Sequence, residues 1–203
     1  YHYVPEVSGD TFLVCDASSD ILCRPMDGSK FGIIYGGAQK NLGPSGMAFM
    51  VLRESLLERC ADDLPTMVDY RTHVAKGSRF NTPNTFSIYV VERVAAWIED
   101  SGGVEAMGAR NQAQADAIYG TIDGSDFWSG KARTDSRSIM NITFATPSDE
   151  LDKLFVAQAA EAGLIGLKGH RSVGGLRASV YNSIPQTAID ALVQFMVEFE
   201  RTN

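Results

Sequence analysis

The sequence predicts an α/β protein built from two successive parts. In the first part, short apolar runs alternate with glycine-bearing turns, which is typical of buried strands joined by loops. From Thr85 onward, apolar residues recur at helical spacing, and this pattern stops at the glycine-containing stretch 100–103. We therefore expect a first domain over residues 1–100 and a small α+β domain over residues 101–203.

The first part contains three apolar runs of strand length, each bounded by turn residues: Thr11–Cys15, Phe31–Tyr35 and Met47–Leu52. The helix that follows them rests on the spacing of Phe86, Tyr89, Val90, Val94 and Trp97. After the glycine stop, a second helix is expected over Val104–Ile122.

Strands and helices alternate in the second part. A strand is expected over Arg137–Ala145, followed by a helix with Ser148 as its N-cap and Gly163 as its stop. The buried stripe of that helix is expected to comprise Leu151, Leu154, Phe155, Ala159 and Ala162. A strand over Leu176–Val180 precedes a last helix that begins at Pro185 and buries Ile189, Leu192, Val193, Met196 and Phe199.

Composition excludes several classes of protein. The 203 residues carry 18 basic and 25 acidic side chains, a net charge of −7, which argues against a nucleic-acid-binding protein. The longest apolar run, Met47–Leu52, is too short to cross a bilayer. Three cysteines without a C-x-x-C pair fit a reducing compartment better than a disulfide scaffold, so we expect a cytoplasmic protein. His2 and His73 have no partners at metal-ligand spacing, and no metal is expected.

A lysine and an acid follow two neighbouring predicted strands. Asp16 ends the first strand and Lys40 lies in the glycine-rich turn after the second. A solvated surface lysine and a turn aspartate are the plain interpretation, and the turn does not match a P-loop because Asn41 follows the lysine. An acid and an amine at one sheet edge would instead suit pyridoxal phosphate, which needs a lysine amine and a carboxylate opposite its ring nitrogen.

The second part also contains a local excess of positive charge. The segment 163–181 carries Lys168, His170, Arg171 and Arg177 but no acid, and its glycines permit tight turns. This composition fits either a solvated basic loop or a site for a carboxylate or phosphate. The tryptophans, Phe127 and the methionines are interpreted as core residues.

Several stretches carry a resemblance to a known family. They are the stretch 14–25, the stretch Phe31–Asn41, Asn81-Thr82-Pro83, Arg137–Asn141, Lys168–Arg171 and Gly174–Asn182. Together they closely resemble the phosphoserine aminotransferases, which are class V, fold type I enzymes that use pyridoxal phosphate. The resemblance covers nearly the whole chain. It implies that residues 1–100 are the remainder of the large cofactor-binding domain.

The resemblance implies a role for each matching residue. Lys40 would form the Schiff base with the cofactor and then shuttle the proton. Asp16 would pair with the pyridinium nitrogen, and Gln39 would contact the cofactor. Asn81 and Thr82 would reach the cofactor phosphate of the neighbouring subunit in a homodimer.

The same resemblance assigns the cationic segment to the substrate. Arg177 would hold the α-carboxylate, and His170 and Arg171 would hold the phosphate. The implied reaction transfers an amino group between glutamate and 3-phosphohydroxypyruvate, giving 3-phosphoserine and 2-oxoglutarate in serine biosynthesis, with a role in pyridoxine biosynthesis also implied.

Two alternatives remain open at this point. The chain matches the C-terminal part of the family, so it is either a piece that docks to a separate N-terminal segment, which completes the site, or a truncated fragment. A non-catalytic fragment that retains the fold is the first alternative. The second is another class V aminotransferase with a non-phosphorylated substrate, which would not need His170 and Arg171.

Overall fold

The computed structural model describes residues 3–203, which divide into two compact units. The N-terminal unit comprises Pro5–Ile21 and Met26–Asp100. The C-terminal unit comprises Ser101–Asn203 together with residues 3–4 and Leu22–Pro25. The short segment Leu22–Pro25 thus groups with the C-terminal unit, although it lies inside the expected first domain.

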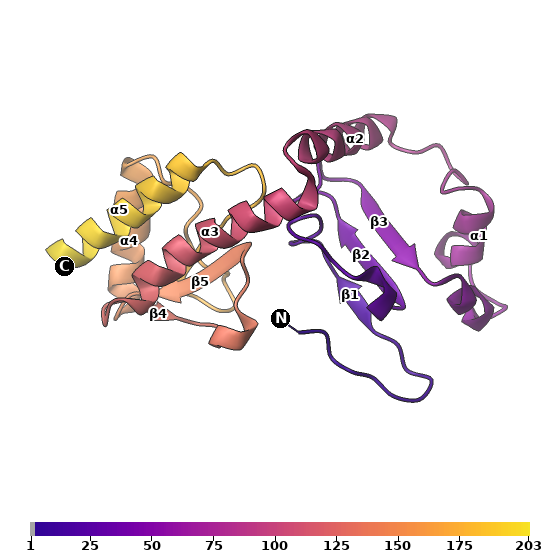
Figure 1. Cartoon of the computed structure of the whole chain (residues 1–203), viewed down its shortest axis with the longest axis horizontal. Helices are drawn as coiled ribbons and strands as arrows, with labels where there is room; N and C mark the ends of the chain where they lie inside the picture. The colour runs from indigo at the N-terminus through magenta and orange to yellow at the C-terminus, as the bar shows by residue number, and fades with distance from the viewer. Residues whose placement is uncertain (1–2) are drawn as a thin grey trace. The chain divides into compact units, whose positions relative to one another are not determined.

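The N-terminal unit is built on a three-stranded sheet with β2 in the middle (Figure 1). Its strands are β1 (Val14–Asp16), β2 (Ile33–Gly37) and β3 (Ala48–Leu52), each shorter than or slightly shifted from the predicted runs. β1 and β2 are parallel, with Asp16 opposite Tyr35, whereas β3 is antiparallel to β2. The carboxyl ends of β1 and β2 therefore meet at the same edge of the sheet.

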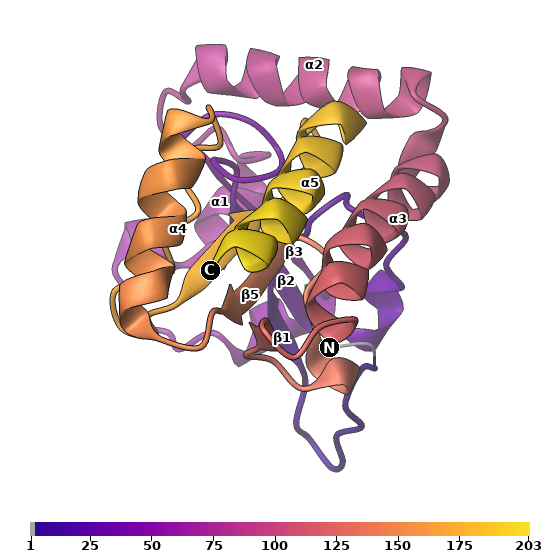
Figure 2. The same cartoon turned by 90° about the vertical axis from the view of Figure 1, so that its left-hand side faces the viewer.

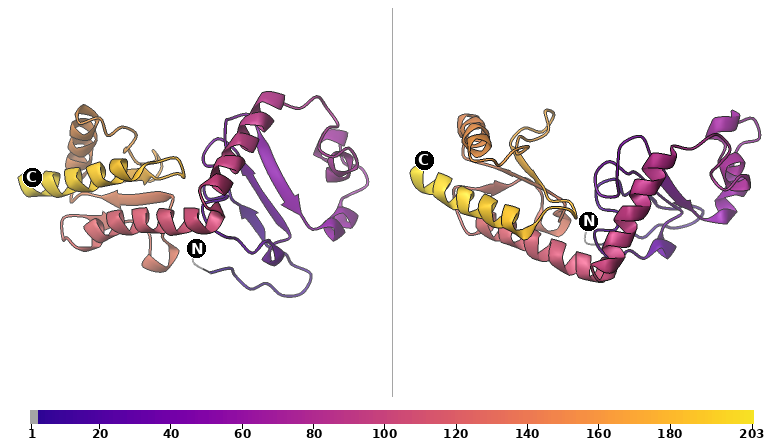
Figure 3. Two further views of the ribbon diagram at one scale, coloured as in Figure 1. Left: turned by 45° about the horizontal axis from the view of Figure 1, so that its top comes forward. Right: turned by 90° about the horizontal axis from the view of Figure 1, so that it is seen from above.

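Two helices complete this unit. The long helix α2 (Thr85–Asp100) agrees with the predicted one, and the side-chain oxygen of Asn84 accepts a hydrogen bond from the backbone N–H of Ser87 in its first turn. The short helix α1 (Tyr70–Ala75) was not predicted, and Figures 1 and 3 show it beyond β3, on the side away from β1. Short 3₁₀ turns lie at Gly28–Lys30, Glu54–Arg59 and Thr66–Val68.

The C-terminal unit packs three helices with a second three-stranded sheet, ordered β4-β5-β6. The sheet is antiparallel throughout. The elements are α3 (Gly103–Asp123), β4 (Ser129–Gly130), a 3₁₀ turn (Thr134–Ser136), β5 (Asn141–Ala145), α4 (Asp149–Glu161), β6 (Leu176–Ser179) and α5 (Gln186–Thr202). Helices α3 and α5 contact each other and lie side by side in Figure 2.

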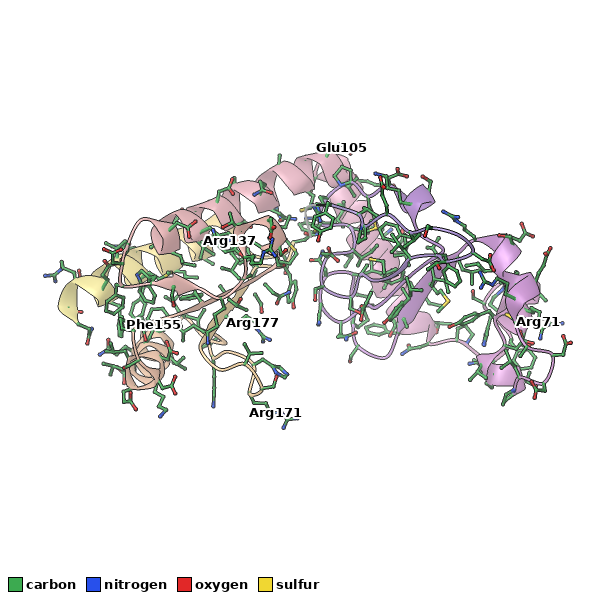
Figure 4. All side chains as sticks on the ribbon, turned by 90° about the horizontal axis from the view of Figure 1, so that it is seen from below. Arg71, Glu105, Arg137, Phe155, Arg171 and Arg177 are labelled. Atoms are coloured by element: carbon green, nitrogen blue, oxygen red, sulfur yellow. The ribbon has the colours of Figure 1, made fainter. Side chains whose placement is uncertain are left out.

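An aromatic cluster forms the core of the C-terminal unit. Phe155 on α4 is fully buried, and its ring centroid lies 5.3 Å from that of Trp128 and 5.1 Å from that of Phe199. Figure 4 shows Phe155 among the side chains that gather beside α4. The predicted apolar face of α5 is confirmed, because Ile189, Leu192, Met196 and Phe199 are all at most 5% exposed. The predicted N-cap is also confirmed, since the Ser148 hydroxyl accepts a hydrogen bond from the backbone N–H of Leu151.

Some predictions of burial and extent were wrong. The strand expected from Arg137 begins only at Asn141, because the chain first passes through the 3₁₀ turn and the Arg137 side chain pairs with Asp123 on α3. Leu154 is 38% exposed and Ala162 is exposed, because the buried stripe of α4 is narrower than its apolar pattern. Trp97 is also 38% exposed, so it is not a core residue. Met26, Met50 and Met67 are exposed, so the prediction that the methionines are core residues is wrong for these three.

Candidate functional site

The acid and the lysine singled out in the sequence both lie at the carboxyl edge of the first sheet. Asp16 is the last residue of β1, and Lys40 follows the end of β2 by one short turn. Both side chains are exposed, and the positive charge of Lys40 acts on the Asp16 carboxylate. The parallel pairing of β1 with β2 is what brings these two groups to one place.

Two consecutive serines link this acid and this lysine to the same turn. The Asp16 Oδ1 atom accepts hydrogen bonds from the backbone N–H of Ser18 at 3.0 Å and from its hydroxyl at 2.6 Å. The Lys40 Nζ atom donates to the hydroxyl of Ser19 at 3.1 Å. Ser18 in turn accepts a hydrogen bond from the backbone N–H of Gly37 at 3.0 Å, which ties the turn to the end of β2.

The surroundings of Asp16 keep its carboxyl group ionised. The two hydrogen bonds from Ser18 lower the pKa of Asp16 below its ordinary value, and Tyr35 and Lys40 lower it further. The neighbouring carboxylate in turn raises the pKa of Tyr35. An acid held as a carboxylate is suited to binding a protonated ring nitrogen.

The glycines at the end of β2 allow the loops to approach each other closely. A Cβ atom on Gly36 would lie 2.9 Å from the backbone nitrogen of Ser18 and 2.8 Å from the Phe49 ring. A Cβ on Gly37 would lie 2.3 Å from the side-chain oxygen of Gln39, so this exposed amide folds back over Gly37. Gln39 therefore lies beside the lysine at the same edge.

Asn81 and Thr82 lie in the same unit, in the exposed segment before α2. The Asn81 amide contacts the carbonyl of Thr82 at 3.2 Å. Among residues 3–203, no hydrogen bond or ion pair joins either residue to Asp16 or Lys40. Their expected role across a subunit interface stays a prediction.

The cationic residues of the C-terminal unit lie on and beside one loop. Leu167 and Arg177 are hydrogen-bonded through their backbones, and the loop between them closes with a bond from Gly169 N–H to the Gly175 carbonyl. Figure 4 shows Arg171 at the tip of this loop and Arg177 nearer the sheet. Arg177 is on β6, opposite Thr143 of β5.

These cationic side chains form no close ion pairs with other described residues. Over the described chain, Lys168, His170, Arg171 and Arg177 form no ion pair. The Nε atom of Arg177 is buried and has no hydrogen-bond partner. The His170 Nδ1 atom lies 2.7 Å from the Ser172 hydroxyl, and its Nε2 atom forms no hydrogen bond within the described residues. Such unpaired donors can bind an anion.

The fold adds groups that the sequence segment did not contain. A pocket of about 440 Å³ is lined by Lys168, His170 and Arg171 from the loop and by residues of α4, namely Asp149, Asp152, Lys153 and Val156. The segment is therefore free of acids in sequence but not in space. The Asp152 carboxylate accepts two bonds from Thr146 and is only 8% exposed, so it serves the fold rather than the pocket.

Sequence reasoning missed Ser18 and Ser19 as partners of the acid and the lysine. The Asp-x-Ser spacing after a strand is a known turn pattern and could have indicated the Ser18 contact. The Ser19 contact depends on the pairing of β1 with β2 and has no local signal. Of the two histidines set aside, His73 contacts the Met67 carbonyl at 3.0 Å, and His2 lies outside the described residues.

Two further observations concern the described chain as a whole. Residues 3–203 contain no group of three His, Cys, Asp or Glu side chains that could hold a metal ion. None of their helices combines the length and apolarity needed to span a bilayer.

Comparisons with known proteins agree on one family. The pattern described as Aminotransferase class-V matches residues 3–192. The phosphoserine aminotransferase of Desulfatibacillum aliphaticivorans is 56% identical, with 97% of this chain and 55% of the relative covered. The solved phosphoserine aminotransferase from Bacillus circulans subsp. alkalophilus superposes with a TM-score of 0.92 at 50% identity, covering 96% of this chain and 54% of that one.

A third relative is the solved PLP-bound phosphoserine aminotransferase from Trichomonas vaginalis, with a TM-score of 0.89 at 39% identity. The alignment covers 96% of this chain and 55% of that one. The chain thus spans about half the length of the relatives it matches. Because the family pattern extends over almost all of the sequence and the fold agrees, this chain belongs to the class-V aminotransferase family.

Proposed function

We propose that this chain carries the cofactor acid, the cofactor lysine and the substrate-phosphate loop of a phosphoserine aminotransferase. The reaction would interconvert 3-phosphohydroxypyruvate and glutamate with 3-phosphoserine and 2-oxoglutarate. The observation that carries the proposal is the meeting of Asp16 and Lys40 at one sheet edge, where each is held by a serine of the same turn.

The groups at this edge fit pyridoxal phosphate. Both bonds from Ser18 reach Asp16 Oδ1, so Oδ2 takes no bond from this serine. The ionised Asp16 would hold the proton on the ring nitrogen, and Gln39 would lie beside the ring. When bound, the cofactor supplies an electron sink for the electron pair released at the substrate Cα. The Lys40 amine would remove the proton from Cα of the amino-acid substrate in one half-reaction and supply a proton to Cα of the keto-acid substrate in the other.

The loop around His170 supports a phosphorylated substrate. A phosphate carries nearly two negative charges and can accept hydrogen bonds from several donors. His170 and Arg171 form no ion pair among the described residues, and Arg177 has a buried Nε atom with no hydrogen-bond partner. Arg177 would bind the α-carboxylate, and the two loop residues would bind the phosphate.

A homodimer is part of the proposal. Asn81 and Thr82 are exposed, and α2 begins just after them with Phe86 70% exposed and Tyr89 60% exposed. Apolar side chains this open to solvent are suited to burial against a second copy. We propose a cytoplasmic location, which is supported by the absence of a disulfide bond at Cys15, Cys23 and Cys60 among the described residues.

The cofactor test uses the purified chain and added pyridoxal phosphate. We expect an absorbance band of bound cofactor that is lost in Lys40→Ala. The control is Lys30→Ala, which removes a lysine from the 3₁₀ turn at Gly28–Lys30 and should leave the band unchanged. If neither the wild type nor the control binds the cofactor, alone or together with an N-terminal segment, the non-catalytic alternative is favoured.

The substrate test compares O-phosphoserine with serine. We expect the His170 ring signals in NMR spectra to shift with O-phosphoserine at concentrations where serine has no effect. Arg171→Gln should weaken this binding about tenfold, because a charge-assisted hydrogen bond is worth roughly 1.5–3 kcal/mol. Arg133→Gln is the control, since Arg133 pairs with Asp135 outside the loop.

Turnover separates the two enzymatic hypotheses. Glutamate should be consumed with 3-phosphohydroxypyruvate and much more slowly with pyruvate or glyoxylate. The opposite preference would favour a class V aminotransferase that acts on a non-phosphorylated substrate.

A further inference from the structure

The N-terminal unit contains two turns with the same sequence pattern and the same local hydrogen bonds. In one, Asp16 Oδ1 accepts from the backbone N–H of Ser18 at 3.0 Å and from its hydroxyl at 2.6 Å. In the other, Asp27 Oδ1 accepts from the backbone N–H of Ser29 at 3.1 Å and from its hydroxyl at 2.6 Å. The turns thus provide a matched pair within one fold.

One further bond distinguishes the two turns. The Ser18 hydroxyl also accepts a hydrogen bond from the backbone N–H of Gly37 on β2, at 3.0 Å. In the part of the chain that is described, the Ser29 hydroxyl accepts no such bond from another strand. Ser18 is therefore the middle member of a relay that runs from Gly37 through the serine hydroxyl to Asp16.

The relay fixes where the serine proton goes. A hydroxyl has one proton to donate, and its lone pairs accept. Because Gly37 donates to Ser18 Oγ, the hydroxyl proton is directed to the carboxylate, and successive bonds of this kind strengthen one another. Because Gly36 has no Cβ, which would lie 2.9 Å from the Ser18 nitrogen, the turn can lie close against β2.

Other ionisable groups also act on the carboxylate. Tyr35 faces it from β2 and Lys40 from the following turn, and both favour the ionised form. Cys15 precedes it on β1, and its own pKa is raised, mainly by burial and in part by the negative charges of Asp20 and Asp16. Ser18 differs from these groups because its hydroxyl bonds both to Asp16 Oδ1 and to the backbone N–H of Gly37 on β2.

We propose that Ser18 is a positioning residue for Asp16. Through its bond to Gly37, Ser18 would hold the Asp16 carboxylate in a fixed orientation toward the cofactor ring. The inference rests on the proposed function, because it takes Asp16 as the acid that binds the ring nitrogen. Ser18 does not touch the reacting atoms, and its effect passes through Asp16.

The first test needs no cofactor. The titration of the Asp16 side-chain carboxyl carbon is followed by NMR in the wild type, Ser18→Ala, Ser18→Thr and Ser29→Ala. We expect the pKa of Asp16 to rise in Ser18→Ala, to return toward the wild-type value in Ser18→Thr and to be unchanged in Ser29→Ala. Hydrogen exchange at the Gly37 amide should be about tenfold faster in Ser18→Ala, which corresponds to ~1.4 kcal/mol.

The second test measures pyridoxal phosphate itself. In Ser18→Ala, the dissociation constant of the cofactor should rise about tenfold. The ring nitrogen of the cofactor, whose protonation is read from the absorbance spectrum, should lose its proton at a lower pH than in the wild type. Ser29→Ala should match the wild type in both measurements.

The outcomes separate the two proposals. An unchanged Asp16 titration and an unchanged Gly37 exchange rate in Ser18→Ala would overturn the positioning role, whether or not the cofactor binds. Equal cofactor affinity and equal spectra in Ser18→Ala and the wild type would overturn it as well. A wild-type chain that binds no cofactor, together with an Asp16 titration that responds to Ser18→Ala, would contradict the proposed function while the relay stands.

Discussion

Replacing Phe155 by alanine should destabilise the C-terminal unit severely. The ring is fully buried, with centroids 5.3 Å from Trp128, 5.2 Å from Phe195 and 5.1 Å from Phe199. Removing a buried phenylalanine ring costs about 3–5 kcal/mol, because the neighbouring rings lose their contacts and a cavity remains. With a urea m-value of ~2 kcal/mol/M, the unfolding midpoint should fall by about 2 M.

The assay can be confined to this unit and matched to a control on the same helix. Trp128 is 4% exposed and reports unfolding by fluorescence, provided that Trp97 of the other unit is first replaced by phenylalanine. The control is Leu154→Ala, one residue away but 38% exposed, which should change the free energy of unfolding by less than ~1 kcal/mol. If both variants shift the midpoint equally, the assigned burial of α4 is refuted.

Three further predictions concern other parts of the chain. Burial raises the pKa of Tyr119 to about 12, so the folded state retains this proton longer than the unfolded state, and stability should fall as the pH rises from about 10 to 12; Tyr119→Phe should flatten this dependence in alkaline unfolding curves. Asp152→Ala should cost about 1–3 kcal/mol in urea unfolding, because it leaves the buried Thr146 N–H unpaired, whereas Asp152→Asn, which keeps an acceptor, should cost less; equal costs would contradict this. Phe86→Glu, at a site 70% exposed, should preserve the helix content seen by circular dichroism but convert a dimer to a monomer in size-exclusion chromatography, and a variant that stays dimeric would count against α2 as the interface.

The elements that the sequence predicted correctly are those with strong local signals. Helix α5 has an apolar stripe at regular helical spacing, and α4 is preceded by Ser148, whose hydroxyl caps it. The strand β4 has only two residues and exists because Ser129 and Gly130 pair with β5, so no local pattern could indicate it. Arg137 was placed in a strand because it adjoins an apolar run, but its pairing with Asp123 lies outside the sheet.

In the candidate site, too, the features with a local sequence signal could be predicted and those that depend on tertiary contacts could not. The placement of Asp16 and Lys40 at one edge could be predicted, because each follows an apolar run and neighbouring parallel strands end together. The roles of Ser18 and Ser19 could not, since hydrogen bonds between two loops depend on which strands pair and in what register. The acids of α4 beside the cationic loop are likewise a product of tertiary packing.

The grouping of Leu22–Pro25 with the C-terminal unit bears on any attempt to isolate that unit. The fully buried amide of Asn111 donates to the carbonyl of Cys23, and the Asn182 amide donates to the carbonyl of Leu22. A piece limited to residues 101–203 would lose both acceptors and the fully buried Cys23 side chain. A protein expressed from residue 101 onward would therefore have a cavity and unpaired amide groups in its core. Expressing this unit on its own would require residues 22–25 to be added, for example as a separate peptide.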